Sequence, residues 1–224
     1  MIAVSARRKK QQGNAMLESA LVFLPMMAMF FGIIDVSFAV SIQSLFSQAV
    51  RAGSRFATTF SGTYNGTDCG TVAGTGSQAT CITSVVQDNS VGFLAGAKSN
   101  NVTVNYYITG IWPDGTTAGL SKPVVTCNAG TCTAPAFTLP YTYTATTPSG
   151  TTSITIKYAN QPGNVVEVTI PSFPLLWMVP IAGFSAGSQV TDSNGNKGLG
   201  LTLSASSTDV LGGLQQGTTI PPNP

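Results

Sequence analysis

The fold of this 224-residue chain follows from one apolar stretch, LESALVFLPMMAMFFGIIDVSFAVSI at residues 17–42. Apart from Glu18 and Asp35, residues 14–49 carry no charge. The roughly 24 residues from 19 to 42 would rise ~36 Å as a helix, enough to cross a hydrocarbon core of ~30 Å. The stretch therefore predicts one transmembrane helix, with its span at about residues 19–42.

A basic cluster lies just before this stretch, at Arg7, Arg8, Lys9 and Lys10. Basic residues that flank a span stay in the cytoplasm, so we expect a cytoplasmic N-terminus and a C-terminal domain on the other side of the membrane. The alternative is a cleaved secretory signal with a processing site at residues 37–39. The apolar region is longer than the usual 7–15 residues of such a signal, which favours the membrane helix.

The composition excludes several classes of function. Only 8% of the residues are charged, and there is no histidine. The cluster holds four of the ten basic residues, so the rest of the chain sets six basic residues against eight acidic ones. This balance does not suit the neutralisation of phosphates, so we expect no nucleic-acid partner. Without histidine or a visible group of converging acids, we also expect no enzyme, no cofactor and no metal site.

The two acids of the apolar stretch are 17 residues apart, or ~25 Å along a helix. Each can therefore lie near an opposite membrane interface, where a carboxylate costs less than at the bilayer centre. Two interpretations stay open. Glu18 and Asp35 are either tolerated acids, or each has a polar partner in an assembly.

The residues that follow the basic cluster, GNAMLE at 13–18, resemble the processing site of the type IV prepilin superfamily. The resemblance implies that a prepilin peptidase cuts after Gly13 and that the mature chain begins at Asn14. It also gives Glu18 a role in assembly. Asn14 and Glu18 are four residues apart, so a helix places the new amino group and the carboxylate on one face.

Three further segments are similar to the N-terminal signature of TadE-like proteins, pilin-like components of tight-adherence (Flp) pilus systems: Leu24-Pro25, Gly32-Ile33-Ile34-Asp35, and QAVRAGSRFA at 48–57. The similarity covers about the first 57 residues and returns faintly at 165–170 and 201–206, whereas the middle of the chain departs from the family.

This resemblance implies a minor pilin-like subunit, a single-pass protein of the inner (cytoplasmic) membrane that can pass to the pilus or cell surface. Its partners would be the prepilin peptidase, other pilin-like subunits, the pilus assembly machinery and membrane lipid. The alternative function is a membrane-tethered surface or adhesive domain that is neither processed nor polymerised.

The chain beyond the span reads as an amphipathic continuation of the same helix. Apolar residues recur at steps of three and four, at Ile42, Leu45, Phe46, Ala49, Val50 and Gly53. We therefore expect a leader at 1–13 and one helix over 14–60. Arg51 and Arg55 lie on the polar side and face either lipid head groups or water.

The remaining residues predict an extracytoplasmic Thr/Gly/Asn-rich β domain over 61–211, with long loops and a disordered tail at 212–224. A short helix is expected around 82–98. Strands are expected at 102–109, 137–145, 151–158, 164–170 and 199–206, and turn sequences link the second, third and fourth into an antiparallel meander. The fold class is α+β, a long N-terminal helix followed by an antiparallel sheet.

Four cysteines lie in this domain, at Cys69, Cys81, Cys127 and Cys132. An even number outside the cytoplasm favours disulfides. Cys69 with Cys81 and Cys127 with Cys132 is the favoured connectivity because it closes the shortest loops; the other connectivities and a zinc site remain as alternatives.

Two segments admit two interpretations each. The residues DSNGNKG at 192–198 hint at a calcium loop but match a hairpin turn more simply. The uncharged, Pro-rich segment 171–184 either packs under the sheet or meets the membrane surface or a partner, with Trp177 as its anchor.

Overall fold

The computed structural model describes residues 3–59, 62–69, 76–94, 101–108, 122–133, 138–147, 150–176, 188–191, 195 and 197–212. The chain divides into two compact units. The first joins Met1–Ile42 with Leu175–Leu201, and the second joins Gln43–Pro174 with Thr202–Pro224. The possible calcium loop falls mostly outside the described residues, as do Trp177 and the tail beyond Gly212.

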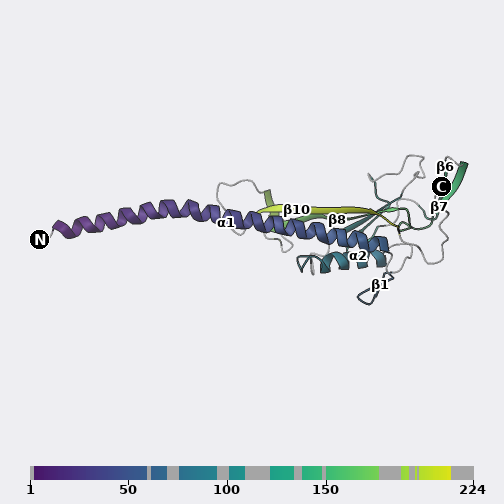
Figure 1. The fold of residues 1–224 in the computed structure, drawn as a ribbon, viewed down its shortest axis with the longest axis horizontal. Coiled ribbons are helices and arrows are strands. Elements are labelled where there is room, and N and C mark those ends of the chain that lie inside the picture. The colour runs from purple at the N-terminus through teal and green to yellow at the C-terminus, as the bar shows by residue number, and fades with distance from the viewer. Residues whose placement is uncertain are drawn as a thin grey trace. The chain divides into compact units, whose positions relative to one another are not determined.

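The longest element is α1, which runs from Ala3 to Thr59 without interruption (Figure 1). Leucine, methionine, phenylalanine and alanine dominate its first half, and these residues favour a helix or tolerate one. Pro25 lies inside α1 and removes one backbone hydrogen bond without ending the helix. The predicted single helix is confirmed, and it also includes the basic cluster.

The first unit contains the N-terminal part of α1 and strand segments from residues 175–201. Strand β9 (Ser188–Thr191) pairs antiparallel with the start of β10 (Lys197–Val210). Gly200 of β10 lies so close to β8 (Val165–Leu176) that an added Cβ would meet the carbonyl of Leu175. Glycine at this position therefore permits the close approach of the two strands.

The second unit is built on a sheet with strand order β5-β4-β3-β8-β10-β9, of which β9 and the beginning of β10 belong to the first unit. The central strand β3 (Thr103–Tyr107) pairs antiparallel with β4 (Val125–Asn128) on one side and with β8 on the other. Strand β5 (Thr131–Cys132) continues the sheet beyond β4. The sheet is thus antiparallel, as the fold class predicted.

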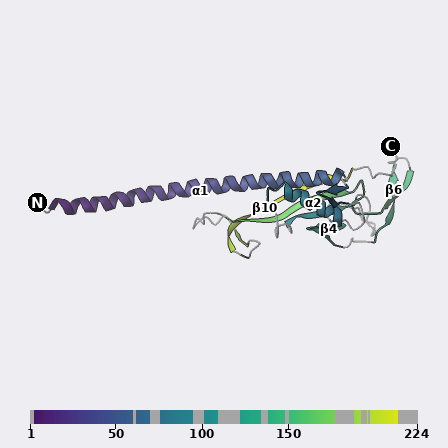
Figure 2. The ribbon, with the colours of Figure 1, turned by 90° about the horizontal axis from the view of Figure 1, so that it is seen from below.

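The core of the second unit lies on one face of this sheet. The register places Val104 opposite Cys127 and Val168, and Tyr106 opposite Val125 and Val166, and all six of these side chains are buried. Helix α2 (Gly76–Asp88) and the C-terminal part of α1 cover this core, and the two helices lie side by side in both views (Figures 1 and 2).

The predicted helix at 82–98 exists but lies further toward the N-terminus, since α2 ends at Asp88 and a turn follows it. The loop expected before it instead holds a small hairpin of β1 (Thr63–Tyr64) and β2 (Thr67–Asp68). Asn65 and Gly66 form its tip with positive φ angles of 47° and 77°. Asn-Gly suits this turn because both residues tolerate the left-handed conformation.

The predicted meander is wrong in one link. Strands β6 (Tyr141–Thr147) and β7 (Gly150–Ile156) pair with each other in a separate two-stranded sheet, and β8 pairs with β3 and β10 instead of β7. The Asn164 side chain donates to the carbonyls of Tyr158 and Ala159 and so fixes a turn after β7. The backbone of Asn164 then pairs with Leu211, which directs β8 toward β10.

Both predicted disulfides form. Cys69–Cys81 ties the β1–β2 hairpin to α2, and Cys127–Cys132 joins opposite residues of β4 and β5. No cysteine is free. Because a disulfide sulfur offers no thiolate to a metal, this pairing contradicts the zinc alternative.

Candidate functional site

The residues expected to carry processing and assembly lie on a single helix. Gly13, Asn14 and Glu18 all fall within α1. Glu18 is exposed, and within the described part of the chain its carboxylate has neither an ion pair nor a hydrogen bond.

The surface of α1 that follows Glu18 is apolar on all sides from Ala20 to Ile34. None of the side chains from Met16 to Ile34 is buried, and among the large ones Met16 is 79% exposed and Leu24 is 72% exposed. Among the described residues, one helix is long and apolar enough to cross a membrane, and only 6% of its most apolar window is buried in the chain. The core helix of a soluble protein would be mostly covered, so this exposure supports membrane anchoring.

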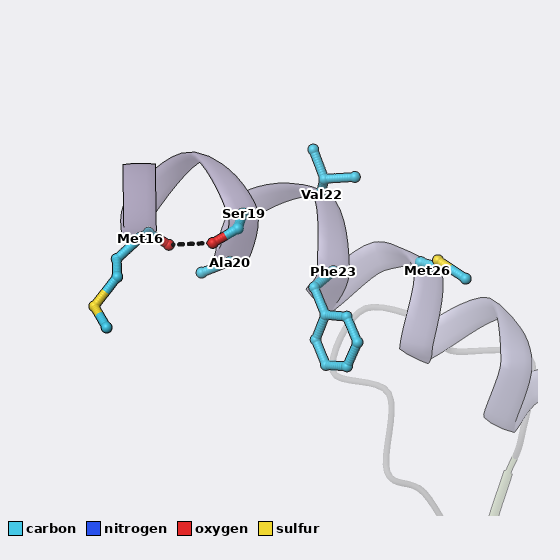
Figure 3. A pocket seen from close by; sticks show the side chains of 6 residues that line it. All are labelled: Met16, Ser19, Ala20, Val22, Phe23 and Met26. Atoms are coloured by element: carbon cyan, nitrogen blue, oxygen red, sulfur yellow. Dashed lines mark hydrogen bonds between the residues drawn. The ribbon is translucent and has the colours of Figure 1, made fainter. Parts of the chain in front are cut away.

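A shallow hollow runs along this exposed segment, lined by Met16, Ser19, Ala20, Val22, Phe23 and Met26 (Figure 3). The lining residues all come from about three turns of one helix. The Ser19 hydroxyl donates to the Met16 carbonyl at 3.0 Å, so it is satisfied within the helix. A hollow with one wall suits contact with an apolar chain or a second helix better than enclosure of a small molecule.

Asp35 differs from Glu18 in its surroundings. It is 5% exposed and makes an interaction within the chain. Ala39 and Ile42 follow it on the same stripe of α1 and are also buried in the first unit. The structure therefore separates the two acids, because Glu18 faces outward and Asp35 belongs to the internal packing of the chain.

In the second unit the buried stripe of α1 continues with Phe46, Ala49, Val50, Gly53, Ser54 and Ala57. Steps of three and four residues keep these positions on one face. Phe46 packs edge to face against Phe173 of β8, with ring centroids 4.9 Å apart. The amphipathic stripe predicted from the sequence is thus confirmed as the face that packs on the domain.

The opposite face of this part of α1 carries Arg51 and Arg55, which are both exposed. Among the described residues neither arginine has an ion pair. The polar side predicted from the sequence is therefore exposed, and both interpretations of these arginines remain predictions.

A polar cluster that the sequence did not indicate lies on the outer face of the sheet. Glu167 of β8 accepts a hydrogen bond from the Tyr107 hydroxyl at 2.6 Å and one from Asn105 Nδ2 at 3.1 Å. The Thr126 hydroxyl donates to Asn105 Oδ1 at 2.9 Å. The cluster depends on the register that sets Asn105 opposite both Thr126 and Glu167, and only strand pairing reveals it.

The cluster changes the acidity of its tyrosine. Burial is the largest cause that raises the pKa of Tyr107 to about 12. The hydrogen bond to Glu167 and the charge of that carboxylate act in the same direction, whereas the hydrogen bond with Asn105 lowers the pKa. Tyr107 therefore stays neutral and remains a donor to Glu167 at physiological pH.

Among the described residues, the geometry brings no catalytic set together. Glu18 and Asp35 are ~25 Å apart along the helix, and in the described ranges no three acidic, cysteine or histidine residues gather as metal ligands. What the structure presents instead is an apolar helix surface with one exposed acid near its beginning. Residues 13–55 match the family model of TadE-like proteins.

The match begins at Gly13 and ends within the amphipathic part of α1, so it confirms the resemblance read from the sequence. A TadE-like segment together with an apolar N-terminal helix fits a protein related to the tight-adherence pilus, with pilus-system partners in general. The β domain lies outside the matched residues. No curated protein and no solved structure matches the chain significantly.

Proposed function

We propose that the protein is a minor pilin-like subunit in the biogenesis of tight-adherence pili, held in the inner membrane by α1 before it joins the assembly. The single observation that carries the proposal is the largely exposed apolar surface of residues 16–34, in which no side chain is buried and which lies inside the TadE-like match. Apolar surface of this extent needs lipid or sister helices to cover it.

The membrane-embedded part of α1 is residues 16–34 in this proposal. These 19 residues rise ~28 Å as a helix, which fits a hydrocarbon core of ~30 Å. The outer limit is set by Asp35, Ala39 and Ile42, whose burial in the chain leaves that stripe unavailable to lipid. The embedded segment thus ends earlier than the sequence-based expectation of about 42.

The orientation follows from the basic cluster. Arg7, Arg8, Lys9 and Lys10 remain in the cytoplasm, where a prepilin peptidase cuts after Gly13. The β domain, with its two disulfides, then lies in an oxidising compartment outside the cytoplasm.

Glu18 pairs with the amino group that cleavage creates on Asn14, in the same subunit or in a neighbour. The charge is tolerable near the membrane interface, but inside a bundle of apolar helices an unpaired carboxylate would be costly. An ion pair with the new amine removes this cost. In the uncut chain this amine does not exist, which fits the absence of any partner for Glu18 among the described residues.

A pilus assembly experiment tests the proposed role. In cells that lack this protein, wild-type chain is expected to restore pili, and Glu18→Ala is expected to insert into the membrane normally but to restore few. Ser41→Ala is the control, because Ser41 lies beyond the embedded segment and its hydroxyl bonds to the Ser37 carbonyl of the same helix. Pilus formation by Glu18→Ala at the wild-type level would contradict the role of Glu18. Normal pili without the protein would favour the unpolymerised surface domain.

A further inference from the structure

The tip of the β1–β2 hairpin joins an asparagine to a glycine, at Asn65 and Gly66. Both residues are exposed, and a Cβ added to Gly66 would have nothing within 4 Å. The hairpin consists of two residue pairs. A ladder this short opens readily, because a two-stranded hairpin is at best marginally stable in water.

The backbone nitrogen of Gly66 follows the Asn65 side chain directly in the chain. The hairpin ladder uses the residues on either side of the tip, and no described residue accepts a hydrogen bond from the Gly66 N–H. Glycine also has no side chain that would shield this nitrogen or restrict its movement. When the tip opens, the nitrogen can therefore reach the amide carbon Cγ of Asn65 and close a five-membered ring.

One contact restrains the Asn65 side chain in the closed hairpin. Asn65 Nδ2 donates to Asp88 Oδ2 at 3.1 Å, and the Tyr64 hydroxyl donates to the same oxygen at 2.7 Å. Asp88 is the last residue of α2, so the two hydrogen bonds fix the hairpin tip to the end of this helix. While they last, the Asn65 amide is held toward Asp88 and is not free to turn toward the Gly66 nitrogen.

We propose that Asn65 is a site of spontaneous deamidation and that its contact with Asp88 slows the reaction. The Gly66 nitrogen bonds to Cγ of Asn65, the bond from Cγ to the side-chain nitrogen breaks, and ammonia leaves with the proton of the Gly66 N–H. Water then opens one of the two C–N bonds of the cyclic imide, which gives aspartate or isoaspartate. One water is consumed and one ammonia released, without an oxidant or a reductant.

The product changes the contact between the hairpin and α2. Both forms carry a carboxylate in place of the amide, and a carboxylate only accepts hydrogen bonds. Asp88 therefore loses this donor and faces a like charge instead. The Tyr64 hydroxyl remains as a donor to Asp88, and the Cys69–Cys81 disulfide still ties the base of the hairpin to α2. Deamidation thus loosens the tip of the hairpin and leaves its base attached.

Asn89 provides an internal comparison, because it is also exposed but its surroundings differ. The residue after it is Ser90, whose N–H donates to the Gln87 carbonyl at 3.0 Å. The Asn89 side-chain amide donates to the Val85 carbonyl at 2.8 Å. Because both the nitrogen that would attack and the amide are engaged, we expect Asn89 to stay intact while Asn65 reacts.

Mass spectrometry of the full chain, kept in detergent at mildly alkaline pH and then digested, tests the proposal. Residue 65 is expected to become one dalton heavier with time and to appear in both an aspartate and an isoaspartate form, while Asn89 keeps its mass. No change at residue 65 or an equal change at residue 89 would overturn the proposal. Aspartate without isoaspartate would overturn it as well, since direct hydrolysis of the amide gives aspartate alone.

The contact with Asp88 is tested by two variants. Asp88→Ala frees the Asn65 side chain and should increase the rate of the mass change at residue 65, whereas an unchanged rate would contradict the restraint by Asp88. Asn65→Asp has the aspartate product in place from the start and should speed amide hydrogen exchange in residues 63–68.

The double variant Asn65→Asp with Asp88→Asn is the control for this effect, because it again pairs a donor with an acceptor. Its exchange should return toward that of wild type. Exchange in Asn65→Asp as slow as in wild type, or equally fast in the single and the double variant, would contradict the proposed loosening. The hairpin lies outside the TadE-like match, and none of this chemistry depends on the proposed function.

Discussion

Tyr107 and Glu167 show how one residue pair links the register of the sheet to its stability. The hydroxyl of Tyr107 is a neutral donor to a charged acceptor, and the tyrosine is 6% exposed. A hydrogen bond to a charged group contributes about 1.5–3 kcal/mol. Tyr107→Phe keeps the ring but leaves Glu167 with Asn105 as its remaining donor within the cluster.

The pKa of Tyr107 predicts how this contribution changes with pH. In the unfolded chain the phenol ionises near pH 10, whereas the folded chain holds the proton up to about pH 12. Between these values the unfolded state binds fewer protons, so stability falls as the pH rises. We expect Tyr107→Phe to lower the thermal midpoint at pH 7–9. The difference in thermal midpoint between this variant and wild type should become smaller from pH 10 to 12.

The same comparison with Tyr64→Phe is the control for this prediction. The pKa of Tyr64 is also raised, chiefly by its hydrogen bond to Asp88, but its side chain is more exposed than that of Tyr107. We therefore expect Tyr64→Phe to lower the thermal midpoint by less than Tyr107→Phe does. If the difference in thermal midpoint between Tyr107→Phe and wild type stayed constant up to pH 12, the Tyr107 hydroxyl would not hold its proton more firmly in the folded than in the unfolded state.

The packing of α1 on α2 depends on Gly53. A Cβ at this position would lie 2.6 Å from Cγ2 of Val86, which is itself fully buried. We expect Gly53→Ala to destabilise the fold by up to about 2 kcal/mol, because overpacking costs about 1–3 kcal/mol and the better helix propensity of alanine returns about 1 kcal/mol. Denaturant unfolding in detergent measures the change.

Two variants control this measurement. Gly32→Ala lies in the same helix, where nothing is within 4 Å of an added Cβ, and should not destabilise. Val86→Ala should cost less in the Gly53→Ala background than in wild type, because it makes room for the new methyl group. If Val86→Ala lowered the stability equally in both backgrounds, the destabilisation by Gly53→Ala would not come from the contact with Val86.

At the level of elements, the sequence predicted which helices and strands exist better than it predicted where they begin and end. Period-two and helical patterns located α1, α2 and five strands, but β8 extends through Pro171 and Pro174, where a strand was not expected. Strand β3 pairs only with residues 165–169 of β8. Beyond Thr169 that side of β8 has no pairing with β3, so the missing N–H of Pro171, two residues further on, is tolerated there.

The link from β7 to β8 could not be predicted because it depends on contacts distant in sequence. The turn sequence at 161–164 is compatible with a hairpin and also with the observed turn away from β7. Pairing with Leu211, nearly 50 residues later, decides between them. The polar cluster around Glu167 was missed for the same reason, since each of its members is unremarkable within its own strand.

For the molecule as a whole, the sequence predicted the long apolar helix that supports membrane anchoring, but it did not predict where the rest of the chain covers this helix. Hydropathy is similar before and after Asp35, and the burial of Asp35, Ala39 and Ile42 within the chain distinguishes the two segments. The proposed limit at Ile34 therefore rests on tertiary structure.

Thiol labelling tests this limit. The native cysteines are all paired, so single cysteines at Met29, Val36 and Val40 report on their own surroundings. The last two side chains are 53% and 64% exposed. In membrane vesicles that expose the outer face, a membrane-impermeant maleimide should label Val36→Cys and Val40→Cys but not Met29→Cys. Protection of all three would extend the embedded segment to about Ile42.

The central claim is that the chain is processed as a prepilin-like subunit, and the N-terminus of the membrane-extracted protein tests it most directly. Sequencing with an intact mass should find a chain that begins at Asn14 and, in Gly13→Ala, a chain that keeps its leader. A wild-type protein that retains Met1, with Gly13→Ala indistinguishable from it, would contradict the claim.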